Sequence, residues 1–495
     1  MNAVPATTAD LLAATASRVP ERIAAVEGDE CLTWAQLADA VAGRSLTLAA
    51  AGVGPGKAVA VVLPNGIDFV VHVLAVMGLG AVAVPLNPTY TARELDTYAR
   101  VSHVSGIVAN PEVVDVLRER ADAEVWGHGV WVVTAAEDPP PATIAGAARP
   151  PGPGDAAVVA FSSGSTGTPK RIVRTHANLL HEADGFFATV GTTESDVILG
   201  VAPLSHAHGW SNCMLAAVRS GGAMVLLPRF DRDAVLAAVE SNGVTIFPGS
   251  PVMFAALAET RRATPERLAS LRLCFSAGAP LPPETSRLFL SRFGLPVRQL
   301  YGASEVGALT INLEGDPEAT AASVGRPLKG VELVVRRENG ERCDPGEAGE
   351  ISFTSEALAA GYVDDPGSES FAGGWFHSGD IGYLDADGDL YITGRTTLYI
   401  SRGGYKVDPA EVEAVIEAHP DVAEVVVVGS KGGMGEEIVK AVVVARGTRD
   451  DRQLRQEIVA RCRAELAEFK VPRVVEFRPE IPRSPLGKIQ RKYLV

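Results

Sequence analysis

The chain contains 495 residues, 46% of them hydrophobic and 21% charged, and its formal net charge at pH 7 is −15. Such a chain is long enough for more than one globular domain with large hydrophobic cores. The negative charge argues against nucleic acid or an anionic membrane as the main partner, and it makes basic residues next to an anionic ligand more informative.

The first part of the chain alternates helix and strand patterns. Helices are predicted over residues 34–50 and 66–77, and strands over residues 59–63 and 81–85. This alternation is typical of parallel sheets with crossover helices. The apolar stretch 69–86 is interrupted by a histidine and two glycines. It therefore predicts a buried helix that continues into a strand, and not a membrane span.

An apolar run over residues 156–161 leads into a loop rich in glycine and hydroxyl groups. The loop reads Ser162-Ser163-Gly164-Ser165-Thr166-Gly167-Thr168-Pro169-Lys170. Its glycines let backbone N–H groups approach a ligand, its hydroxyls add donors, and Lys170 adds a positive charge. It is not a Walker A loop, because Pro169 and Arg171 flank the lysine. A surface linker has a similar composition, but an extended and then helix-like pattern follows directly, so we predict a polyphosphate-binding loop.

The middle of the chain repeats the α/β rhythm. Short strands and the helices between them are predicted at residues 223–227, 231–242, 244–248, 251–259 and 271–276. From residue 340 on, the pattern changes to glycine-punctuated hairpins. An acidic cluster around Asp387-Gly388 fits a hairpin turn better than a calcium loop, because its glycine comes too early for an EF-hand.

The C-terminal end of the chain predicts a small α+β unit. Its helices and strands are predicted at residues 409–418, 422–428, 438–445, 452–468 and 474–477. The first helix has a clear start signal, with Asp408 as N-cap, Pro409 at the first helical position and Glu411 to complete a capping box.

Further segments carry side chains suited to a nucleotide. They are Ala277-Gly278-Ala279-Pro280, Tyr301-Gly302-Ala303-Ser304-Glu305, Trp375-Phe376-His377-Ser378-Gly379-Asp380, Gly394-Arg395 and Pro485-Leu486-Gly487-Lys488-Ile489-Gln490-Arg491. An aromatic ring can stack on adenine, a carboxylate can bind Mg²⁺ or sugar hydroxyls, and arginine or lysine can contact phosphate oxygens. Alone, each segment also fits a surface turn or, for the last, a basic C-terminal tail.

With the loop at residues 162–170, these segments resemble the motifs of the adenylate-forming superfamily of acyl-CoA synthetases, aryl-CoA ligases, luciferases and peptide-synthetase adenylation domains. The resemblance covers nearly the whole chain. It implies that the 162–170 loop binds the phosphates and that the 277–280 segment backs the adenine and the acyl pocket. It also implies the following roles: Tyr301 stacks on adenine, Ser304 contacts the α-phosphate, Glu305 holds Mg²⁺, Asp380 and Arg395 bind the ribose, and Lys488 acts in adenylation.

The resemblance also implies an α/β fold with two domains. Residues 1–394 are expected to form a large N-terminal domain of mixed sheets flanked by helices, with a β-barrel-like part, and residues 395–495 a small mobile C-terminal α+β domain. The hinge is expected at Thr397. The chain departs from the family residues at Arg171, Thr397 and Leu398, and Arg171 adds a charge beside the leaving group.

A histidine-containing segment, 203–210, aligns with the family segment that borders the acyl and pyrophosphate sites. The predicted lining of the acyl pocket consists of His206, His208, Trp210, Ser250, Ser276 and Gly302. Nearby Ser211 adds to the hydroxyl groups, so the pocket is predicted to suit a small aromatic or short carboxylic acid better than a fatty acid. A metal site at the two histidines is disfavoured, because no third ligand is spaced with them.

The resemblance predicts an ATP-dependent ligase that forms an acyl adenylate, releases pyrophosphate and transfers the acyl group to coenzyme A. Segment 401–406, with Gly403 and Gly404, resembles the loop that passes the pantetheine. A carrier protein or another nucleophile as acceptor, an unusual oxyacid as substrate, and a non-catalytic nucleotide-binding protein are the alternatives. Five cysteines without CxxC spacing and no secretory pattern predict a cytoplasmic location without a stable membrane anchor. The sequence leaves the oligomeric state open between monomer and homodimer.

Overall fold

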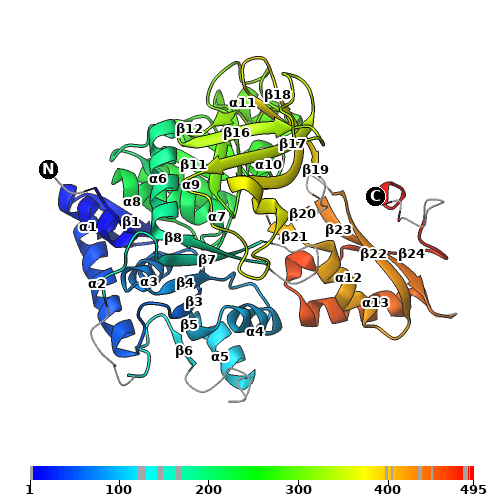
Figure 1. Ribbon diagram of the computed structural model, residues 1–495, viewed down its shortest axis with the longest axis horizontal. Helices are drawn as coiled ribbons and strands as arrows, with labels where there is room; N and C mark the ends of the chain where they lie inside the picture. The colour runs from blue at the N-terminus through cyan, green and yellow to red at the C-terminus, as the bar shows by residue number, and fades with distance from the viewer. Residues whose placement is uncertain are drawn as a thin grey trace.

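The structure is a computed structural model that describes residues 4–120, 130–141, 149–162, 170–395, 400–402, 405–432, 437–447, 450–482, 489 and 491–495. In this part of the chain, two large sheets and a four-stranded sheet form the body, and the C-terminal residues form a separate layer of helices and strands beside it (Figure 1). The mixed α/β fold with a large N-terminal and a smaller C-terminal part agrees with the sequence prediction.

A six-stranded sheet has the order β6-β5-β3-β4-β7-β8. Its strands are β3 (Ala58–Val62), β4 (Val82–Pro85), β5 (Val104–Ala109), β6 (Trp131–Thr134), β7 (Ala156–Ser162) and β8 (Lys170–Thr175), and its helices are α2 (Trp34–Ala50), α3 (Ile67–Gly78), α4 (Ala92–Val101) and α5 (Pro111–Arg120). Neighbouring strands from β6 to β7 are parallel, and β8 returns antiparallel to β7. The predicted buried helix is α3, which continues into β4 and is buried almost throughout.

A nine-stranded sheet has the order β15-β14-β13-β12-β11-β9-β10-β1-β2. Its strands are β1 (Ile23–Glu27), β2 (Glu30–Thr33), β9 (Val197–Gly200), β10 (Ala223–Leu226), β11 (Ile246–Gly249), β12 (Leu273–Ser276), β13 (Val297–Ala303), β14 (Gly307–Ile311) and β15 (Arg326–Pro327). The helices with it are α1 (Thr8–Arg18), α6 (His176–Val190), α7 (Ala207–Gly209), the π-helix η1 (Trp210–Leu215), α8 (Ala216–Ser220), α9 (Arg232–Asn242), α10 (Pro251–Glu259) and α11 (Pro283–Phe293). Strands β9, β11, β12 and β13 are parallel neighbours. Their carboxyl ends therefore meet at one edge, where ligands of α/β sheets bind.

A four-stranded antiparallel sheet follows. It comprises β16 (Val331–Arg336), β17 (Gly349–Ser355), β18 (Phe376–Leu384) and β19 (Leu390–Arg395). The β18–β19 connection turns at Asp387-Gly388, where Gly388 has φ +84°. The Asp385 carboxylate accepts from the N–H groups of Asp387 and Asp389 at 3.0 and 2.9 Å. The acidic cluster thus stabilises the predicted hairpin turn.

The C-terminal layer has its own hydrophobic cluster on each face of its sheet. Its elements are β20 (Ile400–Arg402), β21 (Tyr405–Val407), α12 (Pro409–Glu417), β22 (Val422–Lys431), β23 (Glu437–Ala445), α13 (Asp451–Glu465), the 3₁₀ turn η5 (Glu468–Lys470) and β24 (Val474–Phe477). Asp408 caps α12 as predicted, accepting from Ala410 N–H at 2.8 Å. The predicted capping box is wrong, because the Glu411 carboxylate contacts the Lys470 ammonium instead. The predicted helix 452–468 ends at Glu465, and the domain boundary at 394/395 stays a prediction.

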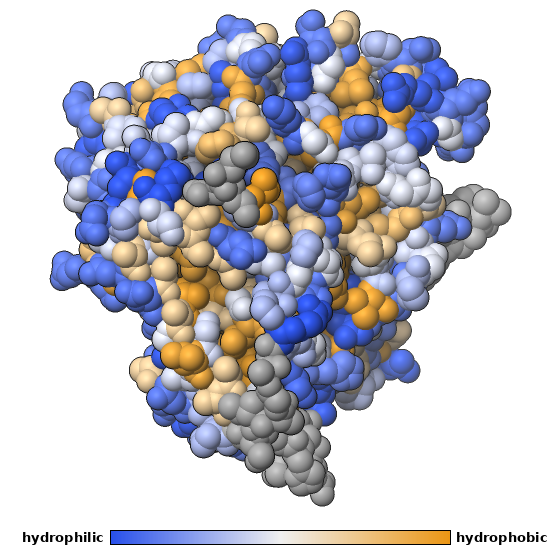
Figure 2. Space-filling view, turned by 60° about the vertical axis from the view of Figure 1, so that its left-hand side comes forward, coloured by the Kyte–Doolittle hydropathy of each residue, from blue (hydrophilic) through white to orange (hydrophobic). Residues whose placement is uncertain are grey.

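The surface is mixed in character. Figure 2 shows one face, on which apolar patches lie between hydrophilic residues. None of the described helices combines the length and hydropathy that crossing a membrane requires. All five cysteines lie in described segments and are free thiols.

An ion pair at the start of β9 supports a first stability prediction. Asp196 is 4% exposed and accepts from the Arg272 guanidinium at 2.7 and 2.8 Å, from Thr245 Oγ1 at 2.7 Å and from Thr193 N–H at 2.8 Å. Burial raises the pKa of this carboxyl, but the hydrogen bonds from Arg272, Thr245 and Thr193 outweigh burial and lower it from 3.8 to about 2. Asp196 therefore stabilises the fold in its ionised form.

We expect Asp196→Asn to lower the free energy of unfolding at pH 7 by about 2 kcal/mol, the equivalent of this pKa shift. Because the folded pKa lies below the unfolded value, the wild type keeps this stability above about pH 5 and loses it progressively as the pH falls toward 2. Urea unfolding can be followed by tryptophan fluorescence, since all five tryptophans lie within residues 1–394. Asp96→Asn, which removes a surface pair with Arg100, serves as the control and should change stability little. A pH-independent difference between Asp196→Asn and wild type would contradict the assignment.

Candidate active site

Several predicted site residues lie outside the described residues. They are Ser163, Gly164, Ser165, Thr166, Gly167, Thr397, Gly403, Gly404 and Lys488. For Ser162 and Arg395 the backbone is described: Ser162 pairs with Lys170 across β7 and β8, and Arg395 pairs with Asp380 across β19 and β18. The predicted phosphate loop therefore connects two paired strands, as the sequence indicated, and does not link two domains.

Five of the predicted residues lie at the carboxyl edge of the nine-stranded sheet. His206 lies in the connection after β9, Ser250 follows β11, Ser276 ends β12, and Tyr301 and Gly302 lie near the end of β13. Because these strands are parallel neighbours, residues 95 positions apart in sequence are brought to one edge. Gly302 has no room for a side chain: a Cβ there would lie 2.5 Å from the Gly307 carbonyl oxygen.

Two of the predicted nucleotide contacts meet directly. Tyr301 Oη donates to Asp380 Oδ2 at 2.5 Å, and Asp380 is only 6% exposed. Tyr301 comes from β13 and Asp380 from β18, so this bond joins the nine-stranded sheet to the four-stranded sheet. A ring and a carboxylate assigned to adenine and ribose thus lie side by side. Gly278, Ala279, Pro280, Ala303 and Ser304 lie in the turns after β12 and at the end of β13.

Lys170 and Glu305 are linked through Tyr362, which the sequence reasoning missed. Glu305 is 6% exposed and accepts from Tyr362 Oη at 2.7 Å. The Lys170 ammonium lies 4.6 Å from the centre of the Tyr362 ring and 3.2 Å from Asp365 Oδ2. The phosphate-loop lysine and the predicted magnesium ligand therefore share one neighbour. The signal in the sequence is the acidic pair Asp364-Asp365 two residues after Tyr362, which belongs to none of the motifs described above.

Arg171 has a defined partner. Its Nε lies 3.1 and 3.0 Å from the two carboxylate oxygens of Asp364, its Nη2 lies 2.6 Å from Oδ1, and its backbone N–H donates to Oδ2 at 3.1 Å. The guanidinium also contacts the Val101 carbonyl. Hydrogen bonding from Arg171 lowers the pKa of Asp364. These contacts favour a positioning role, in which Arg171 holds the segment that carries Asp365 and Tyr362 against β8.

A buried ion pair connects β8, the strand that carries Lys170 and Arg171, to neighbouring elements. Arg174 Nη1 donates to Glu182 Oε2 at 2.7 Å, and the two side chains are 0% and 2% exposed. Arg174 also donates to the Ala357 carbonyl at 3.2 Å, and Glu182 accepts from Ala308 N–H at 3.1 Å. The pair therefore joins β8, α6, β14 and the turn after β17. Nothing in the sequence distinguished these two residues.

His206 lies where the N-terminal part meets the C-terminal part. Its ring is 5.5 Å from the ring of Tyr405 in an edge-on arrangement. Burial, followed by the charge of Lys406, lowers the pKa of His206 to about 4. The imidazole is therefore neutral at pH 7. Ser401 Oγ lies 3.5 Å from the Gly278 carbonyl, so the β20–β21 hairpin faces the site from the C-terminal side.

A buried lysine joins the two parts next to this hairpin. Lys470 is 3% exposed, and its Nζ lies 2.6 Å from Glu94 Oε1 on α4 and 2.8 Å from Glu411 Oε1 on α12. Burial lowers the pKa of Lys470, but the charges of Glu411, Tyr90 and Glu94 outweigh burial and raise it, so the ammonium is charged. This contact crosses 376 residues of sequence, and no motif predicted it.

An aromatic column runs beside the same lysine. The Tyr98 ring stacks on Tyr90 at 5.1 Å, Tyr90 lies 6.3 Å from Phe469, and Phe469 stacks on Tyr405 at 4.3 Å. The column continues from Tyr405 to His206. Packed rings and a buried ion pair therefore hold the C-terminal part in one orientation, with β20–β21 at the site.

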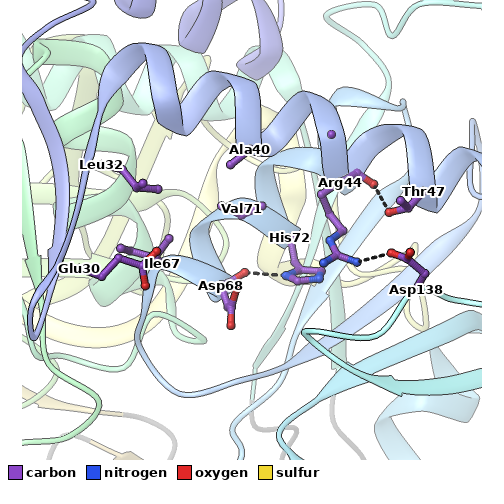
Figure 3. Close-up of a pocket in the computed structure, with 11 residues that line it drawn as sticks. Glu30, Leu32, Ala40, Arg44, Thr47, Ile67, Asp68, Val71, His72 and Asp138 are labelled. Carbon is purple, nitrogen blue, oxygen red and sulfur yellow. Dashed lines mark hydrogen bonds and ion pairs between the residues drawn. The ribbon is translucent and has the colours of Figure 1, made fainter.

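A separate pocket of about 310 Å³ lies between α2 and α3 and contains none of the predicted site residues. Figure 3 shows Arg44 on α2 directed toward Asp138, while His72 and Asp68 lie on α3. The Arg44 guanidinium donates to the Ala135 carbonyl at 2.9 Å and lies 3.4 Å from Asp138 Oδ1, and His72 Nδ1 is 2.7 Å from the Asp68 carbonyl. Burial lowers the pKa of His72. The Arg44 guanidinium and His72 Nδ1 therefore have partners within the protein.

Comparison with known proteins identifies the family to which the sequence is similar. The sequence model of the AMP-binding enzyme family matches residues 12–363, and that of the AMP-binding enzyme C-terminal domain matches residues 411–488. A feruloyl-CoA synthase from Amycolatopsis sp is 34% identical over 475 residues, which cover 95% of this chain and 94% of that protein.

Two solved structures share the fold over almost their full length. An amide bond synthetase from Marinactinospora thermotolerans superposes with a TM-score of 0.87 at 30% identity and 99% coverage of both chains. A double mutant of o-succinylbenzoate CoA synthetase from Bacillus subtilis, bound with its product analogue, superposes with a TM-score of 0.85 at 29% identity and 98% coverage of both chains.

Proposed function

This chain belongs to the AMP-binding enzyme family, and from that premise we propose that it is an ATP-dependent acid–CoA ligase. The observation that carries the proposal is the convergence of separately predicted motifs at one sheet edge. Tyr301 contacts Asp380, Glu305 and Lys170 meet at Tyr362, and His206 meets the hairpin of the C-terminal part. The acid is proposed to be small and aromatic, or short.

The nucleotide is proposed to lie between β13 and β18. Tyr301 offers its ring to adenine, and Asp380 offers a buried carboxylate that can accept from both ribose hydroxyls. When ATP binds, Asp380 exchanges its bond with Tyr301 for bonds with the sugar. Lys170 then contacts the phosphates, which replace Asp365 as its counter-ion.

Glu305 is proposed to hold Mg²⁺. Its carboxylate is buried and fixed by Tyr362, and hard oxygen ligands of this kind suit Mg²⁺. Bound Mg²⁺ supplies charge neutralisation at the phosphate oxygens. Fixing the carboxylate before the substrates arrive means that less reorganisation is needed during the reaction.

Two steps follow from these contacts. In the first, a carboxylate oxygen of the acid forms a bond to the α-phosphorus of ATP, and the bond to the bridging oxygen breaks so that pyrophosphate leaves with its electron pair. Lys170 and Lys488 are proposed to disperse the negative charge. In the second, the thiolate of CoA attacks the acyl carbon, and AMP leaves. Neutral His206 can border both steps without repelling a cationic neighbour.

The orientation of the C-terminal part supports the second step. The β20–β21 hairpin, which includes the predicted pantetheine loop, faces the site at Gly278 and His206. The Bacillus relative with a similar structure carries a product analogue. We therefore propose that this is the acyl-transfer orientation, and that rotation about the hinge near Thr397 presents Lys488 for adenylation.

A panel of small aromatic and short aliphatic acids tests the function. We expect pyrophosphate release that requires both ATP and an acid, and then AMP release with formation of the acyl-CoA that requires CoA. Formation of ADP and phosphate, or ATP turnover without any acid, would overturn the proposal. The similarity to an amide bond synthetase favours one second candidate, acyl transfer to an amine. Acyl-adenylate formation that ends in amide and not in acyl-CoA would establish that alternative.

A further inference from the structure

The structure assigns a hydrogen-bond donor to the acid substrate: we propose that the acid carries a hydroxyl or amino group that binds Asn212 Oδ1. The inference rests on the proposed function, because it places the acyl group at the carboxyl edge of the nine-stranded sheet. It adds Asn212, a residue that no motif indicated, as a specificity determinant. Buried polar atoms without a hydrogen-bond partner among the described residues point to this group.

Three such atoms belong to residues at this edge. Ser211 Oγ, Asn212 Oδ1 and Ser250 Oγ are buried and have no hydrogen-bond partner in the described part of the protein. Their residues are between 2% and 5% exposed. Leaving a buried polar group unpaired destabilises a protein. Three such groups on neighbouring elements therefore indicate a ligand that supplies the missing partners.

The cluster is held together by His208. His208 Nε2 lies 3.0 Å from the Gly249 carbonyl, and Asn212 Nδ2 lies 2.9 Å from His208 Nδ1. Ser250 follows Gly249 directly at the end of β11. The three residues thus come from η1 and the end of β11, next to the connection that carries His206.

The direction of each hydrogen bond can be derived. Burial lowers the pKa of His208 to about 4, so its ring is neutral at pH 7 and carries one N–H. A carbonyl accepts only, so Nε2 must carry the proton that is donated to Gly249. Nδ1 is then an acceptor, and Asn212 must present its NH₂ group to it. Asn212 Oδ1 is left as a fixed acceptor that points away from His208.

The local backbone favours a binding role over a structural one. Ser250 occupies the N-cap position of α10 but makes no side-chain cap bond, although serine is among the best capping residues. Asn212 and Ser211 lie in a π-helix, a form that is rare and is frequent at functional sites. Both features keep polar atoms available that ordinary helix geometry would satisfy.

The ligand chemistry follows from this arrangement. A fixed acceptor requires a donor, and the hydroxyls of Ser211 and Ser250 can either donate or accept. A hydroxyl or amino group at the end of the acid remote from its carboxylate meets these requirements. An unsubstituted acid would leave Asn212 Oδ1 buried and unpaired, and such sites discriminate strongly against substrates that lack the polar group.

Matched pairs of acids test the inference. The pairs are 4-hydroxybenzoate and 4-aminobenzoate against benzoate, 4-hydroxycinnamate against cinnamate, and 4-hydroxybutyrate against butyrate, with kcat/KM measured for pyrophosphate release. We expect the substituted acid of at least one pair to be preferred by about 10²-fold or more. Asn212→Leu should reduce this preference to below about tenfold, mainly by losing the substituted acid.

Thr192→Val is the matched control. Thr192 Oγ1 is also buried without a partner in the described structure, but it lies before β9, at the opposite end of the strand from the site. This variant should keep the preference. Equal use of both acids in every pair would overturn the inference while leaving the ligase function intact. A preference that survives Asn212→Leu would overturn it as well. Absence of acid-dependent pyrophosphate release from all acids would instead refute the proposed function.

Discussion

Lys470→Met is expected to slow acyl transfer to CoA by about 10²-fold while acid-dependent ATP–pyrophosphate exchange stays within about threefold of wild type. The carboxylates of Glu94 and Glu411 both lie within hydrogen-bond distance of the Lys470 ammonium. Removal of one partner from a buried ion pair destabilises the arrangement by about 3–5 kcal/mol, because charge remains buried without compensation. The orientation with β20–β21 at the site should therefore become less populated.

The two half-reactions separate this effect from general damage. Adenylation is measured by isotope exchange between pyrophosphate and ATP, and acyl transfer by single-turnover AMP release from preformed acyl adenylate on addition of CoA. Glu94→Gln keeps the capping-box acceptor that holds Thr91 and leaves Lys470 paired with Glu411, so its effect on acyl transfer should be smaller and in the same direction. Arg93→Gln removes an exposed contact with Glu465 across the same boundary and should change either rate less than twofold. An equal loss of both half-reactions in Lys470→Met would contradict the role in orientation.

The sequence predicted well where local pattern and motif coincide. Helix α2 begins and ends at the predicted residues, because Thr33 and Gln36 form a capping box and the apolar spacing continues to Ala50. The parallel order of β11, β12 and β13 follows from short apolar strands that alternate with helices. His206, Ser250, Ser276 and Tyr301 reach one edge for this reason, and the motifs that contain or adjoin them indicate their chemistry.

The contacts that the sequence did not predict are long-range. Lys470 lies 376 residues from Glu94 and belongs to none of the motifs described above. Glu411 looked like a capping residue, since its spacing from Asp408 fits a capping box, but a buried ammonium within 2.8 Å binds its carboxylate more strongly than a backbone N–H at a helix start. Arg171 departs from the family pattern, and its partner Asp364 lies 193 residues away in sequence. In each case the partner, and not the residue itself, determines the role.

Lys488→Ala is expected to reduce adenylation by about 10²–10³-fold or more, because a lysine that stabilises charge developing in the transition state contributes on that scale. Lys488 itself lies outside the described residues, but the adjacent Ile489 packs with the cluster of Val426, Val428, Val442, Ile481 and Leu494, on the sheet face opposite α12 and α13. The hairpin at the site belongs to a different part of the C-terminal layer. Lys488 can therefore act in one orientation and the hairpin in the other.

The expected defect of Lys488→Ala is the reverse of that of Lys470→Met, with adenylation impaired and acyl transfer kept. In Lys488→Ala, pyrophosphate exchange should fall while acyl transfer from preformed acyl adenylate stays within about threefold of wild type, because a contact made only in the first transition state affects only that step. Lys492→Ala is the control for a merely basic C-terminal tail and should leave both rates nearly unchanged. Loss of pyrophosphate exchange in both Lys488→Ala and Lys492→Ala would indicate a general electrostatic role of the tail. Unchanged exchange in Lys488→Ala would show that Lys488 does not act in adenylation. Lys470→Met and Lys488→Ala together test whether the C-terminal part alternates between two orientations. If it does, Lys470→Met slows acyl transfer and Lys488→Ala slows adenylation, and each variant leaves the other half-reaction nearly unchanged.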